Sequence, residues 1–126
     1  MADKTALKMK AVEWDGKPYH MSVKNVSRPT IQDPADAVVK ITTAAICGSD
    51  LHNYHGLLSG NDVPYIMGHE GVGIVHEVGS AVEKLKVGDR VVVPDFFAHN
   101  GEEEIYGEGN ALGTDIGGCQ GELQYS

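Results

Sequence analysis

The chain has 126 residues and a formal net charge of −8, from 18 acidic and 10 basic residues. This length accommodates one domain, and the negative charge argues against nucleic acid or an anionic membrane as a partner, since both attract basic surfaces. The charge is unevenly distributed. Residues 1–90 hold 11 acidic and all 10 basic residues, whereas residues 91–126 hold 7 acidic residues and no Lys or Arg. The composition therefore changes near residue 91.

The sequence also argues against a membrane-spanning or a secreted protein. No apolar segment approaches the roughly 20 residues that a membrane-spanning helix requires, and the polar start of the chain lacks the apolar core of a secretory signal. The two cysteines, Cys47 and Cys119, are too few and too far apart to form a disulfide framework. These features predict an acidic cytoplasmic domain.

Short segments rich in β-branched residues, separated by Gly, Pro and Asp, predict a domain built mainly from strands. Met9–Trp14 is the first predicted strand. Tyr19–Lys24 alternates apolar and polar residues, which predicts a half-buried strand with its odd-numbered residues facing the core. The apolar segment Ala37–Ile46 predicts a central strand.

The second half of the chain continues this pattern. Val72–Val78 and Arg90–Val93 are the next predicted strands, the latter entered through a turn at Val87–Asp89, and regularity returns at Gly121–Tyr125. Many short strands with turn signals between them favour a small barrel or a sandwich.

One short helix is predicted between the strands. Ser49 or Asp50 could cap a helix of about two turns that Gly56 would end. From Pro94 onward the periodicity is lost, and the acidic run Glu102–Glu104 is expected to lie in a solvated loop.

Two segments hold the side chains that are capable of chemistry. Cys47–His52 follows the predicted central strand, and Gly68–Glu70 precedes the next one. Thiol, imidazole and carboxylate are the ligands that zinc prefers, and the start of a helix after Cys47 would favour its thiolate. Two alternatives remain open, because Cys47 could be a small core residue and His69 could belong to a hydrogen-bonded surface corner. Spacing alone does not join the two segments.

A family resemblance is carried by these same residues. The segment Cys47–His52, followed by Gly68–Gly73 and Glu77–Gly79, resembles the zinc-containing medium-chain alcohol dehydrogenases. The family signature G-H-E-x2-G-x5-G-x2-V is complete from Gly68 to Val82, and Lys86–Val92 is similar to the strand and turn that follow it.

The resemblance implies a fold and a domain organisation. We expect a mostly β domain over residues 1–126, a GroES-like, partly open β-barrel with one or two short helices. Residues of about 94–118 correspond to a lobe that holds a structural zinc in many relatives, but here the lobe lacks the four cysteines. Cys119 is expected to be an ordinary buried or edge residue. The nicotinamide-binding motif G-x-G-x-x-G is missing from the chain, so a Rossmann domain is not expected within it.

The resemblance also implies roles for individual residues. Cys47 and His69 correspond to two of the three ligands of one catalytic zinc, with Glu70 as a neighbouring carboxylate that can approach the metal. Asp50 corresponds to the carboxylate that orients the zinc-binding imidazole. The third zinc ligand of the family is expected to lie beyond residue 126.

Two further residues correspond to the proton relay of the family. Ser49 resembles the hydroxyl that takes the alcohol proton, and His52 resembles the exposed end of the relay, which the proton reaches through a ribose hydroxyl of the cofactor. The implied activity is reversible hydride transfer between a small alcohol or aldehyde and NAD or NADP.

Because the cofactor domain is missing, we expect these 126 residues to be inactive alone and not to form the oligomers that the missing domain mediates. Two other functions remain possible at this stage. One is a GroES-like binding or assembly module without metal, and the other is a zinc-free quinone or enoyl reductase relative, although such relatives usually lack Cys47 and His69.

Overall fold

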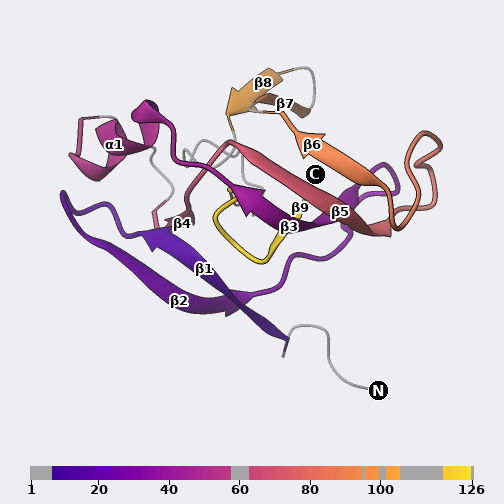
Figure 1. Cartoon of the computed structure of the whole chain (residues 1–126), viewed down its shortest axis with the longest axis horizontal. Coiled ribbons are helices and arrows are strands. Elements are labelled where there is room, and N and C mark those ends of the chain that lie inside the picture. Colours follow the sequence, from indigo (N-terminus) through magenta and orange to yellow (C-terminus); the bar gives the residue numbers. More distant parts are fainter. Residues whose placement is uncertain (1–6, 58–62, 95, 100–101, 106–117, 126) are drawn as a thin grey trace.

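The computed structural model describes residues 7–57, 63–94, 96–99, 102–105 and 118–125, and every structural statement below concerns these residues (Figure 1). They form strands with one helix between them. In chain order the elements are β1 (Lys8–Trp14), β2 (Met21–Ser27), β3 (Ala37–Ala44), α1 (Gly48–Tyr54), β4 (Tyr65–Ile66), β5 (Gly71–Val78), β6 (Arg90–Val93), β7 (Phe96–His99), β8 (Glu102–Ile105) and β9 (Leu123–Tyr125).

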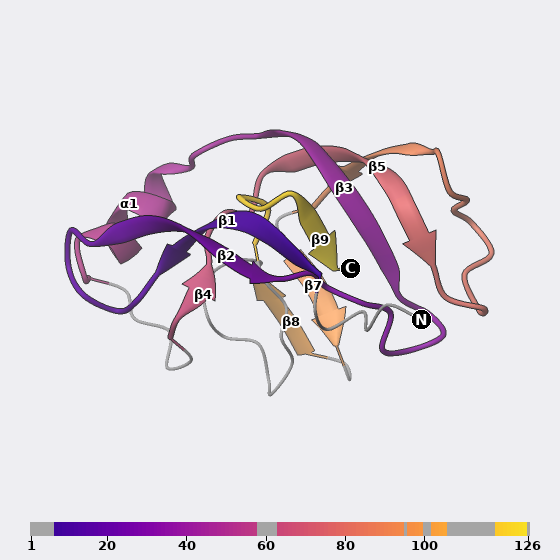
Figure 2. The same ribbon diagram turned by 90° about the horizontal axis from the view of Figure 1, so that it is seen from below.

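The strands form three antiparallel sheets, in the orders β2-β1-β4, β6-β5-β3-β9 and β7-β8. The segment that leads into β9 lies between β1 and β3 and joins the first two sheets (Figure 2). There Ala11 of β1 forms a bridge with Gly121, and the amide of Val12 donates to the carbonyl of Gln120 at 2.8 Å. The described strands do not close into a complete barrel. The predicted partly open β fold is thus confirmed.

Among the described residues, the core consists of three clusters of buried side chains. They are Met9 with Ala11 and Val38, Val39 with Val93 and Cys119, and Trp14 with Met67. Each cluster combines residues from separate strands or segments, so burial of apolar surface holds the sheets together.

Most of the predicted strands are present with small changes at their ends. Met9–Trp14, Val72–Val78 and Arg90–Val93 correspond to β1, β5 and β6, and β9 lies within the predicted Gly121–Tyr125. The central strand β3 is present but ends at Ala44, so Ile46 is 71% exposed. Because residues after Ala44 leave the sheet, they are free to lead into the helix and its site.

The prediction for Tyr19–Lys24 is wrong at its start. Tyr19 lies outside β2 with a φ of 62° and 66% exposure, and Val23 is also exposed. The amide of Tyr19 donates to the carbonyl of Tyr54 at 2.7 Å, and the two rings meet edge to face. This contact with α1 overrides the local alternation. Val23 is 67% exposed, whereas Met21 and Val26 of the same strand are partly buried, so the apolar residues of β2 are not all directed at the core.

The prediction of a solvated loop at Glu102–Glu104 is also wrong, since these residues lie in β8. Strand β8 pairs with β7 in a two-stranded hairpin, with Phe97 opposite Glu104 and His99 opposite Glu102. Cross-strand pairing thus outweighs the low strand propensity of Glu. Of the predicted cysteine-free lobe at about 94–118, residues 95, 100–101 and 106–117 lie outside the described residues.

Candidate metal centre

The turn from β3 into α1 positions Cys47. Cys47 is the residue before the helix, with extended backbone at φ −86° and ψ 155°. The amide of Cys47 donates to Oδ2 of Asp50 at 3.0 Å, and the amide of Asp50 donates to the carbonyl of Cys47 at 3.1 Å. Ser49 and Asp50 were predicted as helix caps, but both lie inside the helix. The prediction is wrong because the Asp50 carboxylate reaches back to the residue three positions earlier.

The second segment reaches the site through the pairing of β3 with β5. Ala44 is opposite Gly71 in the sheet, and the amide of Ala45 donates to the carbonyl of Glu70 at 3.1 Å. The residue before His69, Gly68, has a φ of +101°, a conformation that favours glycine. Antiparallel pairing therefore brings Glu70 and His69 beside the segment that carries Cys47, which the spacing in the sequence could not establish.

Three potential ligand atoms converge at this point. The thiol sulfur of Cys47, a ring nitrogen of His69 and a carboxylate oxygen of Glu70 all lie within 4.8 Å of one another. His69 is buried, Cys47 is half-buried and Glu70 is exposed. Sulfur, imidazole nitrogen and carboxylate oxygen are the ligand atoms that zinc prefers. Because Glu70 is exposed, the site is open to solvent on that side, as in zinc sites that bind a substrate.

The two ring nitrogens of His69 have different neighbours. Nδ1 lies 3.6 Å from Oδ1 of Asp50, and both side chains are buried. Nε2 lies 3.2 Å from Oγ of Ser49. Asp50 and Ser49 thus flank the two ring nitrogens of His69.

Charge at the site depends on burial and hydrogen bonding. Burial raises the pKa of the Asp50 carboxyl, an effect that the backbone N–H of Cys47 and the nearby His69 oppose. The pKa of the Cys47 thiol is lowered, first by the side-chain hydrogen bond from Ser49, then by the Ser49 backbone N–H and by His69. The site therefore favours a thiolate at Cys47, as the position before a helix predicts.

The two cysteines are expected to differ sharply toward iodoacetamide. Cys119 is fully buried, and burial, with a smaller contribution from Asp50, raises the pKa of its thiol to about 11. At pH 8 the metal-free chain should be alkylated at Cys47 more than about 100-fold faster than at Cys119, since only the thiolate reacts. Mass spectrometry of tryptic peptides measures both rates, with a sample unfolded in urea as the control. Equal rates in the folded chain would contradict the burial of Cys119.

The burial of Cys119 also makes the free energy of unfolding depend on pH in the alkaline range. The pKa of its thiol is higher in the folded chain than in the unfolded chain, so its contribution to the free energy of unfolding is fully present below the ordinary pKa of a thiol. That contribution is lost as the pH rises toward about 11.

His52 differs from the other predicted site residues. It lies on α1 with an exposed side chain, and its carbonyl accepts a hydrogen bond from the amide of Leu57. The structure therefore brings five of the predicted residues together, namely Cys47, Ser49, Asp50, His69 and Glu70. His52 is close to Ser49 and Asp50 in sequence, but its side chain is exposed to solvent.

Sequence reasoning missed a contribution from the end of the chain. Residues 118–120 form backbone hydrogen bonds with residues 66–68, immediately before His69. The signal in the sequence is Gly118, the glycine before Cys119. The role of this glycine depends on the contact between residues 118–120 and residues 66–68, which are about 50 positions apart in the sequence. A pattern within a short segment cannot show such a contact.

The fold and this site together define a class, namely a partly open β domain that carries a Cys, His and carboxylate group able to hold a metal. Residues 33–125 match the alcohol dehydrogenase GroES-like domain family. The chain belongs to this family.

Relatives and solved structures agree with this assignment. The chain is 50% identical over 86 residues to the uncharacterised zinc-type alcohol dehydrogenase-like protein AdhB of Bacillus subtilis, covering 68% of this chain and 22% of that protein. It is 40% identical over 113 residues to D-xylulose reductase of Saccharomyces cerevisiae, covering 84% of this chain and 31% of that protein. The alcohol dehydrogenase TADH from Thermus sp. ATN1 superimposes with a TM-score of 0.82 at 35% identity, covering 93% of this chain and 37% of that chain.

The chain thus spans between a fifth and two fifths of the length of these proteins. Within the described residues, α1 has 7 residues, and no helix is long and apolar enough to cross a membrane.

Proposed function

We propose that this chain is the zinc-binding catalytic domain of a zinc-dependent alcohol dehydrogenase, which transfers hydride reversibly between a small alcohol or aldehyde and NAD or NADP. The observation that supports the proposal most directly is the convergence of Cys47, His69 and Glu70 within 4.8 Å. The chain's zinc-type relatives support the same function.

The proposed zinc ligands are Cys47 and His69, with Glu70 as the exposed carboxylate that can approach the metal. A zinc ion in such a site supplies a Lewis acid that polarises the oxygen of an alcohol or carbonyl compound. The lowered pKa of Cys47 suits this role, because the thiolate is the form that binds metal. Asp50 is proposed to orient the ring of His69, with 3.6 Å between Oδ1 and Nδ1.

Ser49 is the proposed first acceptor of the substrate proton. Its hydroxyl lies 3.2 Å from Nε2 of His69, at the position where the ligand atoms converge. The exposed His52, three residues further along α1, is proposed to exchange the proton with solvent and to contact the nicotinamide cofactor. An imidazole suits this exchange because each of its two ring nitrogens can bind or release a proton.

We propose that binding of the nicotinamide needs residues that the longer relatives have and these 126 residues lack. The structure from Sinorhizobium meliloti, named as a zinc-binding dehydrogenase bound to NADP, is covered to only 36% by this chain. The chain lacks a G-x-G-x-x-G motif of its own. The same proposal places the chain in the cytoplasm. It also proposes that the chain binds neither nucleic acid nor a membrane and does not associate with itself.

The proposal predicts zinc binding without turnover. Purified 1–126 should bind zinc at one equivalent or less, measured by elemental analysis after dialysis, because the described residues hold one group of potential ligands. It should produce no alcohol-dependent NADH or NADPH, measured at 340 nm, because its sequence lacks the G-x-G-x-x-G motif that positions the cofactor. Zinc content no higher than that of a Cys47→Ser/His69→Ala control would contradict the metal assignment. Alcohol-dependent reduction of the cofactor would contradict the assignment of the cofactor site.

A further inference from the structure

We infer that Gly118, Cys119 and Gln120 are positioning residues for the ligand pair His69 and Glu70. They bind the segment that delivers these two side chains to the site, although they supply no ligand themselves. The inference rests on the proposed function, because it concerns the geometry of the proposed zinc ligands.

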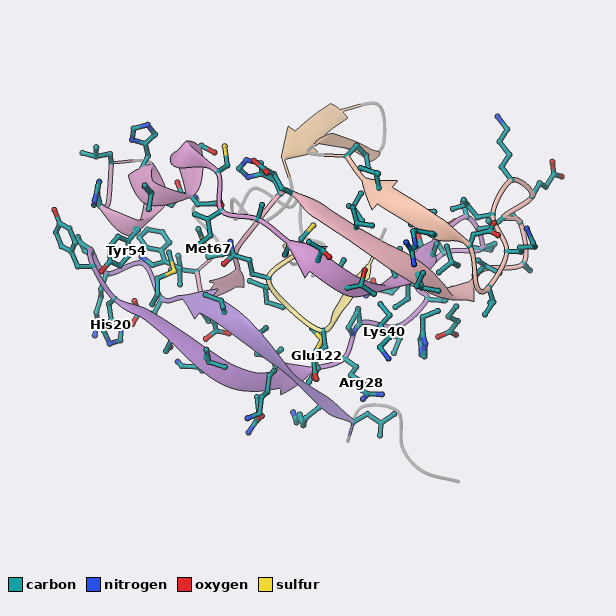
Figure 3. The ribbon with its side chains drawn as sticks, viewed as in Figure 1. His20, Arg28, Lys40, Tyr54, Met67 and Glu122 are labelled. Carbon is teal, nitrogen blue, oxygen red and sulfur yellow. The ribbon has the colours of Figure 1, made fainter. Side chains whose placement is uncertain are left out.

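The first evidence is a ladder of three hydrogen bonds. The amide of Gly118 donates to the carbonyl of Ile66, that of Cys119 to Gly68, and that of Gln120 to Met67, each at 2.9 Å. Three successive donors thus satisfy the three successive carbonyls that precede His69. Figure 3 shows Met67 on this segment, between the two larger sheets and close to the chain that leads to Glu122.

The second evidence is how closely the two backbones approach. A Cβ atom on Gly118 would lie 2.2 Å from the carbonyl oxygen of Met67 and 2.4 Å from that of Gly68. A Cβ atom on Gly71, just after the ligand pair, would lie 2.9 Å from the sulfur of Cys119. Both contacts are closer than real Cβ atoms allow, so any larger side chain must move one segment relative to the other.

The third evidence is that residues 118–120 are themselves anchored. The carbonyl of Gln120 accepts from Val12 of β1 at 2.8 Å, and the amide of Met67 donates to the carbonyl of Val12 at 3.0 Å. Strand β1, the 66–68 segment and the 118–120 segment are thus bonded pairwise into one unit. Cys47 lies on the other side of His69, because it follows β3, whose end is bonded to Glu70 through the amide of Ala45. A displacement of residues 118–120 would move His69 relative to Cys47.

The test compares two glycine substitutions in the full 126-residue chain. Gly118→Ala forces apart the two segments beside the site. Gly88→Ala is the control, because Gly88 has a φ of +98° and no neighbour within 4 Å of its Cβ position, in the turn between β5 and β6. Both changes should lower the melting temperature, but the Gly88 change does so without contact with the site.

The readout is titration with cobalt(II), whose visible absorption reports coordination. Gly118→Ala should weaken cobalt binding by about 10- to 100-fold, the range seen when groups that orient ligands are lost, and should change the absorption bands. Gly88→Ala should leave both the dissociation constant and the spectrum of the folded fraction unchanged. A Gly118→Ala chain that folds and binds cobalt like the wild type would overturn the inference.

A second readout does not depend on metal. In the metal-free chain, the ring resonances of His69 measured by NMR should shift in Gly118→Ala and stay in place in Gly88→Ala, since only the first change moves the ring relative to Ser49 and Asp50. If the wild type binds no cobalt and the His69 signals still shift, the positioning role stands and the proposed zinc function fails. If these signals are unchanged in Gly118→Ala, the positioning role fails.

A milder pair of variants serves if Gly118→Ala does not fold. Gly71→Ala places a methyl group against the Cys119 sulfur, and Cys119→Ala in the same chain removes that sulfur. The single change should weaken cobalt binding, and the double change should recover most of the loss. Absence of weakening in the single change, or of recovery in the double change, would contradict the contact on which the inference rests.

Discussion

Replacing Cys47 by Ser is expected to weaken zinc binding by the folded chain by more than about 100-fold. Loss of an orienting group around a metal costs about 10- to 100-fold, and loss of a ligand should cost more. Cys47 supplies the sulfur ligand of the site, and its lowered pKa means that less free energy is needed to form the thiolate than for an ordinary cysteine. Zinc competition with a chromophoric chelator measures the affinity.

The expected pattern extends to two histidine variants. His69→Ala should have an effect of similar size, because the imidazole lies within the same 4.8 Å group. His20→Ala is the matched control, since its exposed ring bonds to Asp15 at 2.6 Å and belongs to no ligand group. Equal zinc affinity in the wild type, Cys47→Ser and His69→Ala would show that the metal binds elsewhere.

Replacing Trp14 by Ala is expected to lower the free energy of unfolding by about 3–5 kcal/mol, the range for truncating a large buried aromatic residue. Trp14 is 1% exposed at the end of β1, where it packs with Met67 and with the partly buried Met21. Its ring N–H donates to the carbonyl of Lys17 at 3.0 Å. Urea unfolding followed by circular dichroism measures the change.

Trp14→Phe separates packing from hydrogen bonding. It keeps an aromatic ring in the cluster and loses the N–H donor, so it should cost clearly less than the Ala variant. Because Lys17 is exposed, water can replace the lost donor at its carbonyl. Both variants lack the single tryptophan of the chain, so circular dichroism is compared rather than fluorescence. Equal losses in the two variants would indicate that the hydrogen bond, and not packing, is the larger contribution.

Strand composition made much of this fold predictable. Runs rich in β-branched residues and bounded by Gly, Pro and Asp located β3, β5 and β6, because strands select such residues. The failures occurred where a tertiary contact outweighs the local pattern. Tyr19 leaves its predicted strand to contact Tyr54, and Glu102–Glu104 pair with β7 despite their charge.

The candidate site was predictable in its residue types and not in its geometry. Thiol, imidazole and carboxylate in two short segments suggested a zinc site, and the resemblance supplied roles for each residue. The distance between Cys47 and His69 depends on the pairing of β3 with β5, which begins at Ala44 and Gly71. The dependence on residues 118–120 was not predictable, because nothing local distinguishes a glycine in a loop from one that lies against a carbonyl.

The bridge between the two larger sheets has a consequence for synthesis of the chain. Gly121 and Glu122 bond to β1 and β3 through Ala11, Lys10 and Ile41, and thus join strands that were made about 80 to 110 positions earlier. At translation rates of about 5–20 residues per second, both larger sheets wait several seconds for this connection. During that interval Cys47 and His69 have been synthesised, but the unit that holds His69 is incomplete. The unit that holds His69 is therefore completed only once residues 118–122 have been made.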